Sequence, residues 1–249
     1  MIIFHCSAAA AVHLDGNRRG KDSLFPTLAD EGKPFSTSPA DNIFRWVVHA
    51  VKIGHATCLI AMEVKTRWVH VIHRVRKGDL QGFLARLSTR FINGIEWSEA
   101  DLSVLTPTEM GAAIDTYLAQ HHELRFSRQT DRSVMSHIAQ VSSEYRDVWQ
   151  NVGAFPENEE TALSFDLRLN ATLRSTRGSE YWLPVEAMLT QWLNAYAAPG
   201  QDGISEAISR RRSAIMQRRV QDATENEHHA DNSVNKVIDF ESFKKKMLH

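Results

Sequence analysis

The chain has 249 residues, which exceeds the usual size of one domain but falls short of two ordinary domains. Its composition, with 43% hydrophobic and 24% charged residues, excludes a disordered chain, a collagen-like or coiled-coil fibre and a low-complexity protein. The 29 Lys and Arg residues and the 30 Asp and Glu residues leave a net charge of -1, so no overall field attracts the molecule to nucleic acid or to an anionic membrane. We therefore expect one main domain with an extension, and any electrostatic partner must be bound by a local patch.

The only two cysteines, Cys6 and Cys58, lie within apolar, strand-like runs, where a thiol packs as a small hydrophobic group. A buried, reduced pair is the favoured interpretation, and a single disulfide between them stays open. Two cysteines do not form a disulfide framework, which favours an intracellular protein. No segment reaches the ~18 apolar residues that span a bilayer, and the start of the chain lacks the basic region of a secretory signal. We expect a soluble, cytoplasmic protein that does not bind membranes.

The first part of the chain is rich in strand patterns. Ile2–Cys6 is the first predicted strand, and Ser7 is a plausible N-cap for the alanine-rich run that ends at Leu14. Residues 15–41 contain Pro26, Pro34 and Pro39 with several glycines, which predicts a long loop. Three β-rich runs separated by turn residues then predict an antiparallel meander: Ile43–Lys52, Ala56–Val64 and Arg67–Val75.

Helical periodicity follows the meander. Leu80 to Phe91 carry an apolar stripe, and Asn93-Gly94 predicts the end of that helix. Thr106, Pro107 and Glu109 form a capping box for a second helix. A third helix begins after Thr130 or Asp131, and a fourth runs from about Pro184 to Ala198. The pattern predicts an α+β fold in which a small, mostly antiparallel sheet is covered on one face by the helices after Gly78.

The segment Pro199–Gly203 combines two glycines with a proline and reads as a linker. We therefore predict a core domain over residues 1–198 and, over residues 199–249, a linker with a charged, helical C-terminal extension. The extension contains a predicted helix over Ile204–Val220 that is rich in arginine.

Two segments support a resemblance to an uncharacterised family of bacterial domains of unknown function. They are Arg125-Phe-Ser-Arg-Gln-Thr-Asp-Arg-Ser-Val-Met135 and Arg177-Gly-Ser-Glu-Tyr-Trp-Leu-Pro-Val-Glu-Ala-Met-Leu189. The resemblance covers roughly Met1 to Ala198, which supports the predicted domain boundary and implies no activity. The loop over residues 15–41 and the tail after Pro199 are longer than the usual family pattern, which suggests that this member's own function resides in these additions.

No motif in the chain predicts a metal, a cofactor or a catalytic residue. The glycines of Gly16–Ser23 are too closely spaced for a phosphate-binding loop, which leaves an exposed basic loop as the better interpretation. His70 and His73 are three residues apart on a predicted strand, so their rings point to opposite faces and cannot share one ion. Signature sequences of hydrolases and zinc peptidases are absent from the chain.

Asp131, Arg132 and Ser133 are the strongest candidate inside the predicted domain. An acid, a guanidinium and a hydroxyl at a helix N-terminus can bind an anion or orient a substrate. The alternative is structural, because Asp131 or Thr130 is needed as an N-cap and Arg132 can form an ordinary ion pair.

The arginine cluster of the tail is the sharpest local anomaly. Five arginines within ten residues lie beside apolar side chains on the predicted helix: Arg210, Arg211, Arg212, Arg218 and Arg219, with Ile204, Ile208 and Ile215 as apolar anchors. The cluster can neutralise nucleic-acid phosphates, or it can dock onto an acidic or RNA-binding protein surface. A solvated helix face, balanced by Asp222, Glu225 and Glu227, is the third interpretation.

These observations favour a non-enzymatic protein-binding or inhibitory factor that binds a protein or ribonucleoprotein complex stoichiometrically. Accessory proteins of bacterial mobile elements, including anti-CRISPR inhibitors of host defence, share this combination of a stable scaffold and no catalytic signature. The alternative is a nucleic-acid-processing enzyme or toxin that uses Asp131, Arg132 or the histidines. Turnover at substoichiometric amounts distinguishes the enzyme from the binder.

Overall fold

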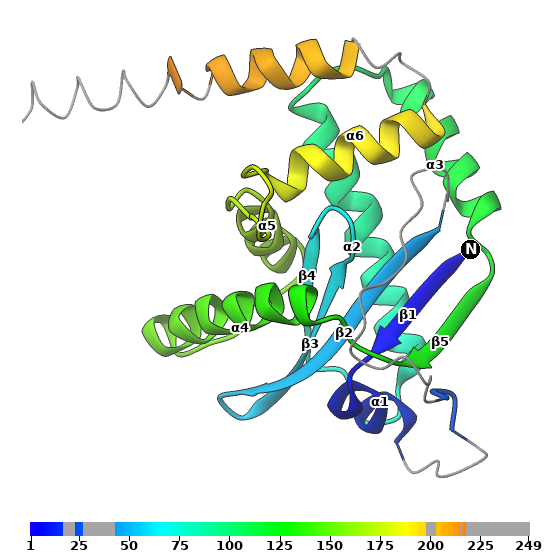
Figure 1. Ribbon diagram of the computed structural model, residues 1–249, viewed down its shortest axis with the longest axis vertical. Coiled ribbons are helices and arrows are strands. Elements are labelled where there is room, and N and C mark those ends of the chain that lie inside the picture. Colours follow the sequence, from blue (N-terminus) through cyan, green and yellow to red (C-terminus); the bar gives the residue numbers. More distant parts are fainter. Residues whose placement is uncertain (17–22, 27–42, 198–202, 215, 218–249) are drawn as a thin grey trace, which may run out of the picture. The chain divides into compact units, whose positions relative to one another are not determined.

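The computed structural model describes residues 1–16, 23–26, 43–197, 203–214 and 216–217. Five strands form one sheet in the order β4-β3-β2-β1-β5 (Figure 1). The strands are β1 (Ile2–Cys6), β2 (Phe44–Ile53), β3 (Ala56–Glu63), β4 (Val69–His73) and β5 (Leu124–Arg128). With the helices around it, this sheet gives an α+β fold, as predicted.

The sheet is mixed, so the prediction of a mostly antiparallel sheet was wrong. The meander of β2, β3 and β4 is antiparallel, as expected, but β1 pairs in parallel with both β2 and β5. The strand β5 was not among the strands predicted from the sequence. Its sequence, Leu-Arg-Phe-Ser-Arg, is short and largely polar, because the strand lies at the sheet edge and Leu124 and Arg125 are exposed there. Parallel pairing is set by the crossover connections, which no local pattern reports.

Helices cover both faces of the sheet, whereas one covered face was predicted. In Figure 1, α4 (Arg132–Val152) crosses in front of the strands and α2 (Leu80–Ala100) lies behind them. Alternating residues of β2 serve the two faces: Trp46 contacts Phe91 of α2, whereas Val47 belongs to the cluster that contains Ile138 of α4. Strands that are buried on both faces do not show the alternation of apolar and polar residues that a half-exposed sheet has.

The predicted helices are present, with one corrected boundary. Ser7 caps α1 (Ala8–Asp15), and the capping box of Thr106 and Glu109 begins α3 (Pro107–Gln120). The stop predicted at Asn93-Gly94 was wrong, because α2 continues to Ala100. Gly94 instead leaves room for the Trp68 ring, because a Cβ atom at this position would lie 2.9 Å from that ring. The last two helices are α5 (Glu159–Asn170), which the sequence analysis missed, and α6 (Pro184–Tyr196), which it predicted.

Side chains from α5 and α2 complete the hydrogen bonds of the edge strand β4. Asn170 accepts from the Val69 N–H at 2.8 Å and donates to the Val69 carbonyl at 2.9 Å. Asp166 accepts from the Val71 N–H at 3.0 Å, and Arg90 donates to the Val71 carbonyl at 2.8 Å. An exposed edge would offer these backbone groups to another chain, so the polar side chains close the sheet on this side.

The two cysteines are buried and free, so the open disulfide is absent. Burial raises the pKa of each thiol to about 12. No helix among the described residues combines the length and apolar character needed to cross a bilayer.

The chain divides into two compact units, Met1–Ile204 and Ser205–His249. The domain boundary predicted after Ala198 falls on residues outside the described ranges, as do most of the loop predicted over residues 15–41 and most of the Gly16–Ser23 segment. These parts of the sequence analysis stay predictions.

Candidate functional site

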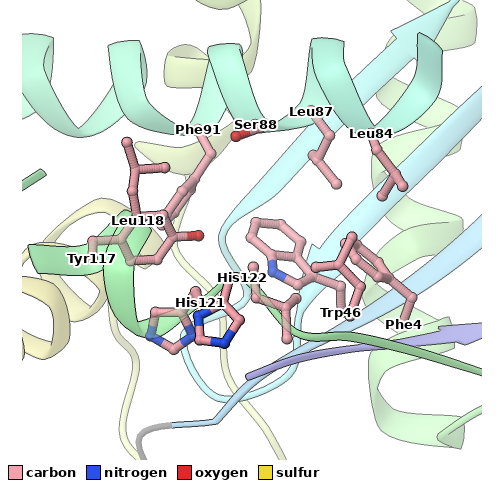
Figure 2. Close-up of a pocket in the computed structure, with 12 residues that line it drawn as sticks. Phe4, Trp46, Leu84, Leu87, Ser88, Phe91, Tyr117, Leu118, His121 and His122 are labelled. Atoms are coloured by element: carbon pink, nitrogen blue, oxygen red, sulfur yellow. The ribbon is translucent and has the colours of Figure 1, made fainter. Parts of the chain in front are cut away.

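An apolar pocket with a volume of about 210 Å³ lies between α2, α3 and the amino-terminal end of β1 (Figure 2). Four aromatic rings line it: Phe4, Trp46, Phe91 and Tyr117. Aliphatic walls come from Ile2, Leu84, Leu87, Leu118 and Leu124. The polar lining residues are Ser88, His121 and His122.

The helix and strand periods explain why these rings converge. Phe4 of β1 and Trp46 of β2 are register partners in parallel strands, so both side chains emerge on the face that α2 covers. Leu84, Leu87 and Phe91 lie three and four residues apart, on one side of α2. Tyr117 stands near the end of α3, where its ring packs against Phe91 with 5.6 Å between centroids. The apolar stripe predicted for Leu80 to Phe91 thus becomes one wall of the cavity, and the end of α3 becomes another.

His121 closes one end of this pocket in a neutral form. Its Nε2 atom lies 2.5 Å from the Tyr196 hydroxyl, and its ring packs at 4.9 Å from that of Tyr117. Burial and the nearby terminal amine lower the pKa of His121 from 6.5 to about 4. The ring is therefore uncharged at neutral pH.

A second polar cluster lies at the N-terminus of α4, where the sequence analysis placed its anion site. Asp131 is the N-cap and accepts from the Val134 N–H at 3.0 Å, which is the structural alternative considered for this residue. Ser133 accepts from Nη2 of Arg67 at 3.1 Å. Arg132, the third predicted residue, begins the helix and is exposed. The structure thus brings Asp131 and Ser133 to one place around Arg67.

Arg67 is the centre of that cluster, and the sequence analysis did not identify it. Its Nε donates to Nδ1 of His137 at 3.1 Å, while Nε2 of His137 lies 3.0 Å from the Ser175 carbonyl. Arg67 has φ of 64°, a left-handed conformation that costs energy outside glycine. Burial lowers the pKa of Arg67, and Asp131 and Glu63 oppose this shift. The Nη1 atom of Arg67 is buried and has no hydrogen-bond partner among the described residues.

The hydrogen bonds around His137 define its chemistry. Since Nδ1 accepts from Arg67, the ring proton is on Nε2 and is donated to the Ser175 carbonyl. Neither nitrogen is left to accept a proton from a substrate. The sequence did contain a signal for His137. It follows Val134 by three residues and so lies on the buried stripe of α4. A polar side chain at such a position needs a hydrogen-bond partner.

The predicted tail helix is present over residues 203–214 and 216–217. Arg210 and Arg212 are exposed and Arg211 is half-buried. Ile204, the last residue of the first compact unit, is fully buried, and Ile208 is half-buried. Ile215, Arg218 and Arg219 lie outside the described residues, so their part in the predicted patch stays a prediction.

Comparison with known proteins identifies one family. The model of a domain of unknown function, DUF6933, matches residues 20–187, which confirms the resemblance inferred from the sequence. This match includes most of both sites and excludes the arginine-rich tail. No curated protein and no solved structure matches the chain.

Proposed function

The chain belongs to the DUF6933 family, and we propose that this member is a non-enzymatic binding or inhibitory factor. It acts by stoichiometric binding to a protein or ribonucleoprotein complex. The observation that carries the proposal is the tail helix, whose Arg210 and Arg212 are exposed in the second compact unit.

Arginine is suited to this role because its planar guanidinium binds carboxylates and phosphates through two parallel hydrogen bonds. The tail also lies beyond the residues that the family shares, 20–187, so it can add a binding surface without changing the common domain. A protein partner would present an acidic surface, whereas a ribonucleoprotein would add RNA phosphates. The specific form that we propose is an accessory protein of a mobile element that inhibits a host defence complex, as anti-CRISPR proteins do.

The first experiment replaces the five tail arginines, Arg210, Arg211, Arg212, Arg218 and Arg219, with glutamine. The wild-type protein and the variant are titrated against bacterial ribonucleoprotein complexes. The wild type should reach saturation at one equivalent, and the variant should lose binding by at least about tenfold with its thermal transition unchanged.

The matched control places the same charge change on exposed residues of the first unit. It replaces Lys52, Arg76, Lys77, Arg125 and Arg177 with glutamine. Equal binding by the wild type and the tail variant would contradict the proposal and return the arginines to a solvated helix face. If RNA dominates the contact, affinity should fall steeply with salt, with a log–log slope of about one per phosphate neutralised.

The alternative function is a nucleic-acid-processing enzyme or toxin. The convergence of Arg67, Asp131, Ser133 and His137 at one helix N-terminus favours it. The occupied nitrogens of His137 count against it, since a general base needs a free lone pair. Cleavage of RNA or DNA by substoichiometric protein, abolished in His137→Gln, would establish the enzyme and exclude the binder.

A further inference from the structure

We propose that the pocket between α2, α3 and β1 binds a small, uncharged, planar aromatic molecule that carries one hydroxyl or a similar hydrogen-bonding group. The proposal concerns a different surface from the tail helix and does not depend on it. It rests on the size and aromatic lining of the pocket, on the Tyr117 hydroxyl that faces into it and on its accessible entrance.

The volume of about 210 Å³ limits the ligand to a single ring or to two fused rings. A cavity of ~150 Å³ lined by Leu, Ile and Phe holds one benzene molecule, so this pocket has room for one ring and a substituent. The rings of Trp46, Phe91 and Tyr117 present both faces and edges toward the space (Figure 2). Aromatic ligands gain from such edge-to-face and offset contacts, whereas a flexible aliphatic chain does not.

The hydroxyl of Tyr117 supplies the polar contact. Figure 2 shows it directed into the space bordered by Trp46 and Phe91. Tyr117 as a whole is only 5% exposed, but its hydroxyl is not among the buried side-chain atoms that lack a partner, so among the described residues it stays accessible from the pocket. A ligand with a matching polar group would keep this hydroxyl hydrogen-bonded, whereas an apolar ligand would cover it without a partner at a cost of about 1–3 kcal/mol. By contrast, the neighbouring Tyr196 hydroxyl is already bound to His121.

The pocket opens to solvent beside apolar side chains. Leu118 and Leu124, which line it, are 47% and 39% exposed, although most leucines are buried. Ser88 and His122 are also exposed and stand beside the entrance. A ligand can therefore enter without rearrangement of the core, and its outer edge would cover the two leucines.

The lining of the pocket favours uncharged ligands, and the Met1 amine, the charged group beside it, is already bonded to Nδ1 of His121 at 3.0 Å and to the Gln120 carbonyl at 3.1 Å. None of its lining residues is Asp, Glu, Lys or Arg. His121 is neutral because its pKa is lowered to about 4. A charged ligand would lose its hydration without a counter-charge, which is the most costly form of burial.

The test uses the full chain with two fluorinated probes followed by ¹⁹F NMR: 4-fluorophenol, which has the hydroxyl, and 4-fluorotoluene, which lacks it. We expect the wild type to bind 4-fluorophenol with a dissociation constant of about 0.1–1 mM, as its eight heavy atoms allow. Ser88→Phe, at an exposed helix position, fills the entrance and should weaken both probes by at least about tenfold. Thr89→Phe, at the next exposed position but outside the lining, is the matched control.

Tyr117→Phe tests the hydroxyl itself. It should weaken 4-fluorophenol by about fivefold and leave 4-fluorotoluene within about twofold, since one hydrogen bond is lost. Tyr181→Phe, at a residue that is 74% exposed and outside the pocket, should change neither probe. Three results would each overturn the proposal: no binding of 4-fluorophenol to the wild type, unchanged binding to Ser88→Phe, or equal weakening by Thr89→Phe. An equal effect of Tyr117→Phe on both probes would overturn the role of its hydroxyl.

Discussion

Buried histidines act as neutral, oriented connectors in this protein. Nε2 of His70 accepts from the Trp68 indole at 2.8 Å, so Nδ1 carries the proton and donates to Asp166 at 2.9 Å. His137 makes the same kind of bridge between Arg67 and the Ser175 carbonyl. The bonds fix the tautomers and orient each ring without any need for a charge.

Three buried histidines should make the protein less stable as the pH falls. Burial lowers the pKa values of His5, His73 and His121 from 6.5 to about 4, with nearby positive groups adding to the shift. Below pH 6.5 these histidines bind protons in the unfolded chain but stay neutral in the folded protein. The stability that they contribute above this pH is therefore lost between about pH 6.5 and pH 4. We expect a loss of about 2 kcal/mol per histidine between pH 7 and pH 5, measured by urea unfolding.

His73→Phe isolates one of these contributions. The His73 ring stacks on Phe155 with 5.3 Å between centroids, and phenylalanine keeps that stack but cannot be protonated. The loss of unfolding free energy between pH 7 and pH 5 should shrink by about 2 kcal/mol. The matched control is His55→Phe, at an exposed position that contacts the same Phe155 ring. An unchanged pH dependence in His73→Phe would refute this assignment.

Which residues were predictable depended on whether their partners are local. The opposite directions of His70 and His73 follow from strand geometry alone, and the structure places one against Asp166 and the other against Phe155. The N-cap role of Asp131 is equally local. Arg67 and His137 are 70 residues apart in sequence, so no pattern in either neighbourhood reports their contact.

At the scale of elements, α5 protects the edge of the sheet through one buried carboxylate. Asp166 accepts hydrogen bonds from His70 at 2.9 Å, Val71 N–H at 3.0 Å and Arg90 at 3.1 Å, and both Asp166 and Arg90 are 1% exposed. The pair holds β4 to α2 and α5. Removal of the Asp166 carboxylate would leave the His70 ring N–H and the Val71 N–H without an acceptor, and Arg90 would keep only Glu159, at 2.6 Å, as a carboxylate partner.

Asp166→Ala should therefore lower the free energy of unfolding by about 3–5 kcal/mol, because two buried donors lose their acceptor and Arg90 loses one of its two carboxylate partners. Chemical denaturation measures this loss. Glu123→Ala is the control: Glu123 pairs with Arg125 at 2.9 Å on the surface, where both side chains are more than half exposed. The control should cost less than about 1 kcal/mol. Similar losses in the two variants would show that the edge cluster does not stabilise the fold.

Elements with strong local signals were predictable, and those defined by tertiary contacts were not. The capping box at Thr106 predicted the start of α3 to the residue. The end of α2 was misplaced because Gly94, which resembles a helix stop, is required by the close approach of Trp68. The strand β5 was missed because one edge strand with a polar sequence has little hydrophobic alternation.

At the scale of the whole molecule, the mixed sheet explains why the pocket escaped prediction. A small antiparallel sheet covered on one face would place β1 at an edge. Instead β1 lies between β2 and β5, which puts Phe4 beside both Trp46 and Phe126. The pocket requires this arrangement together with two helices on one face, and strand order is a property of the whole chain.

The separation into two units predicts that the first unit folds without the tail. A chain ending at Ile204 keeps every strand and all of α1 to α6, together with the buried Ile204 side chain. It should unfold in one cooperative transition with nearly the stability of the full chain, as measured by urea denaturation.

A chain ending at Ala198, the boundary predicted from the sequence, loses Ile204 and should be less stable by about 1.5–3 kcal/mol, the value of burying one isoleucine. An insoluble or molten 1–204 product would mean that the tail belongs to the core, and equal stability of the two fragments would show that Ile204 contributes nothing to it.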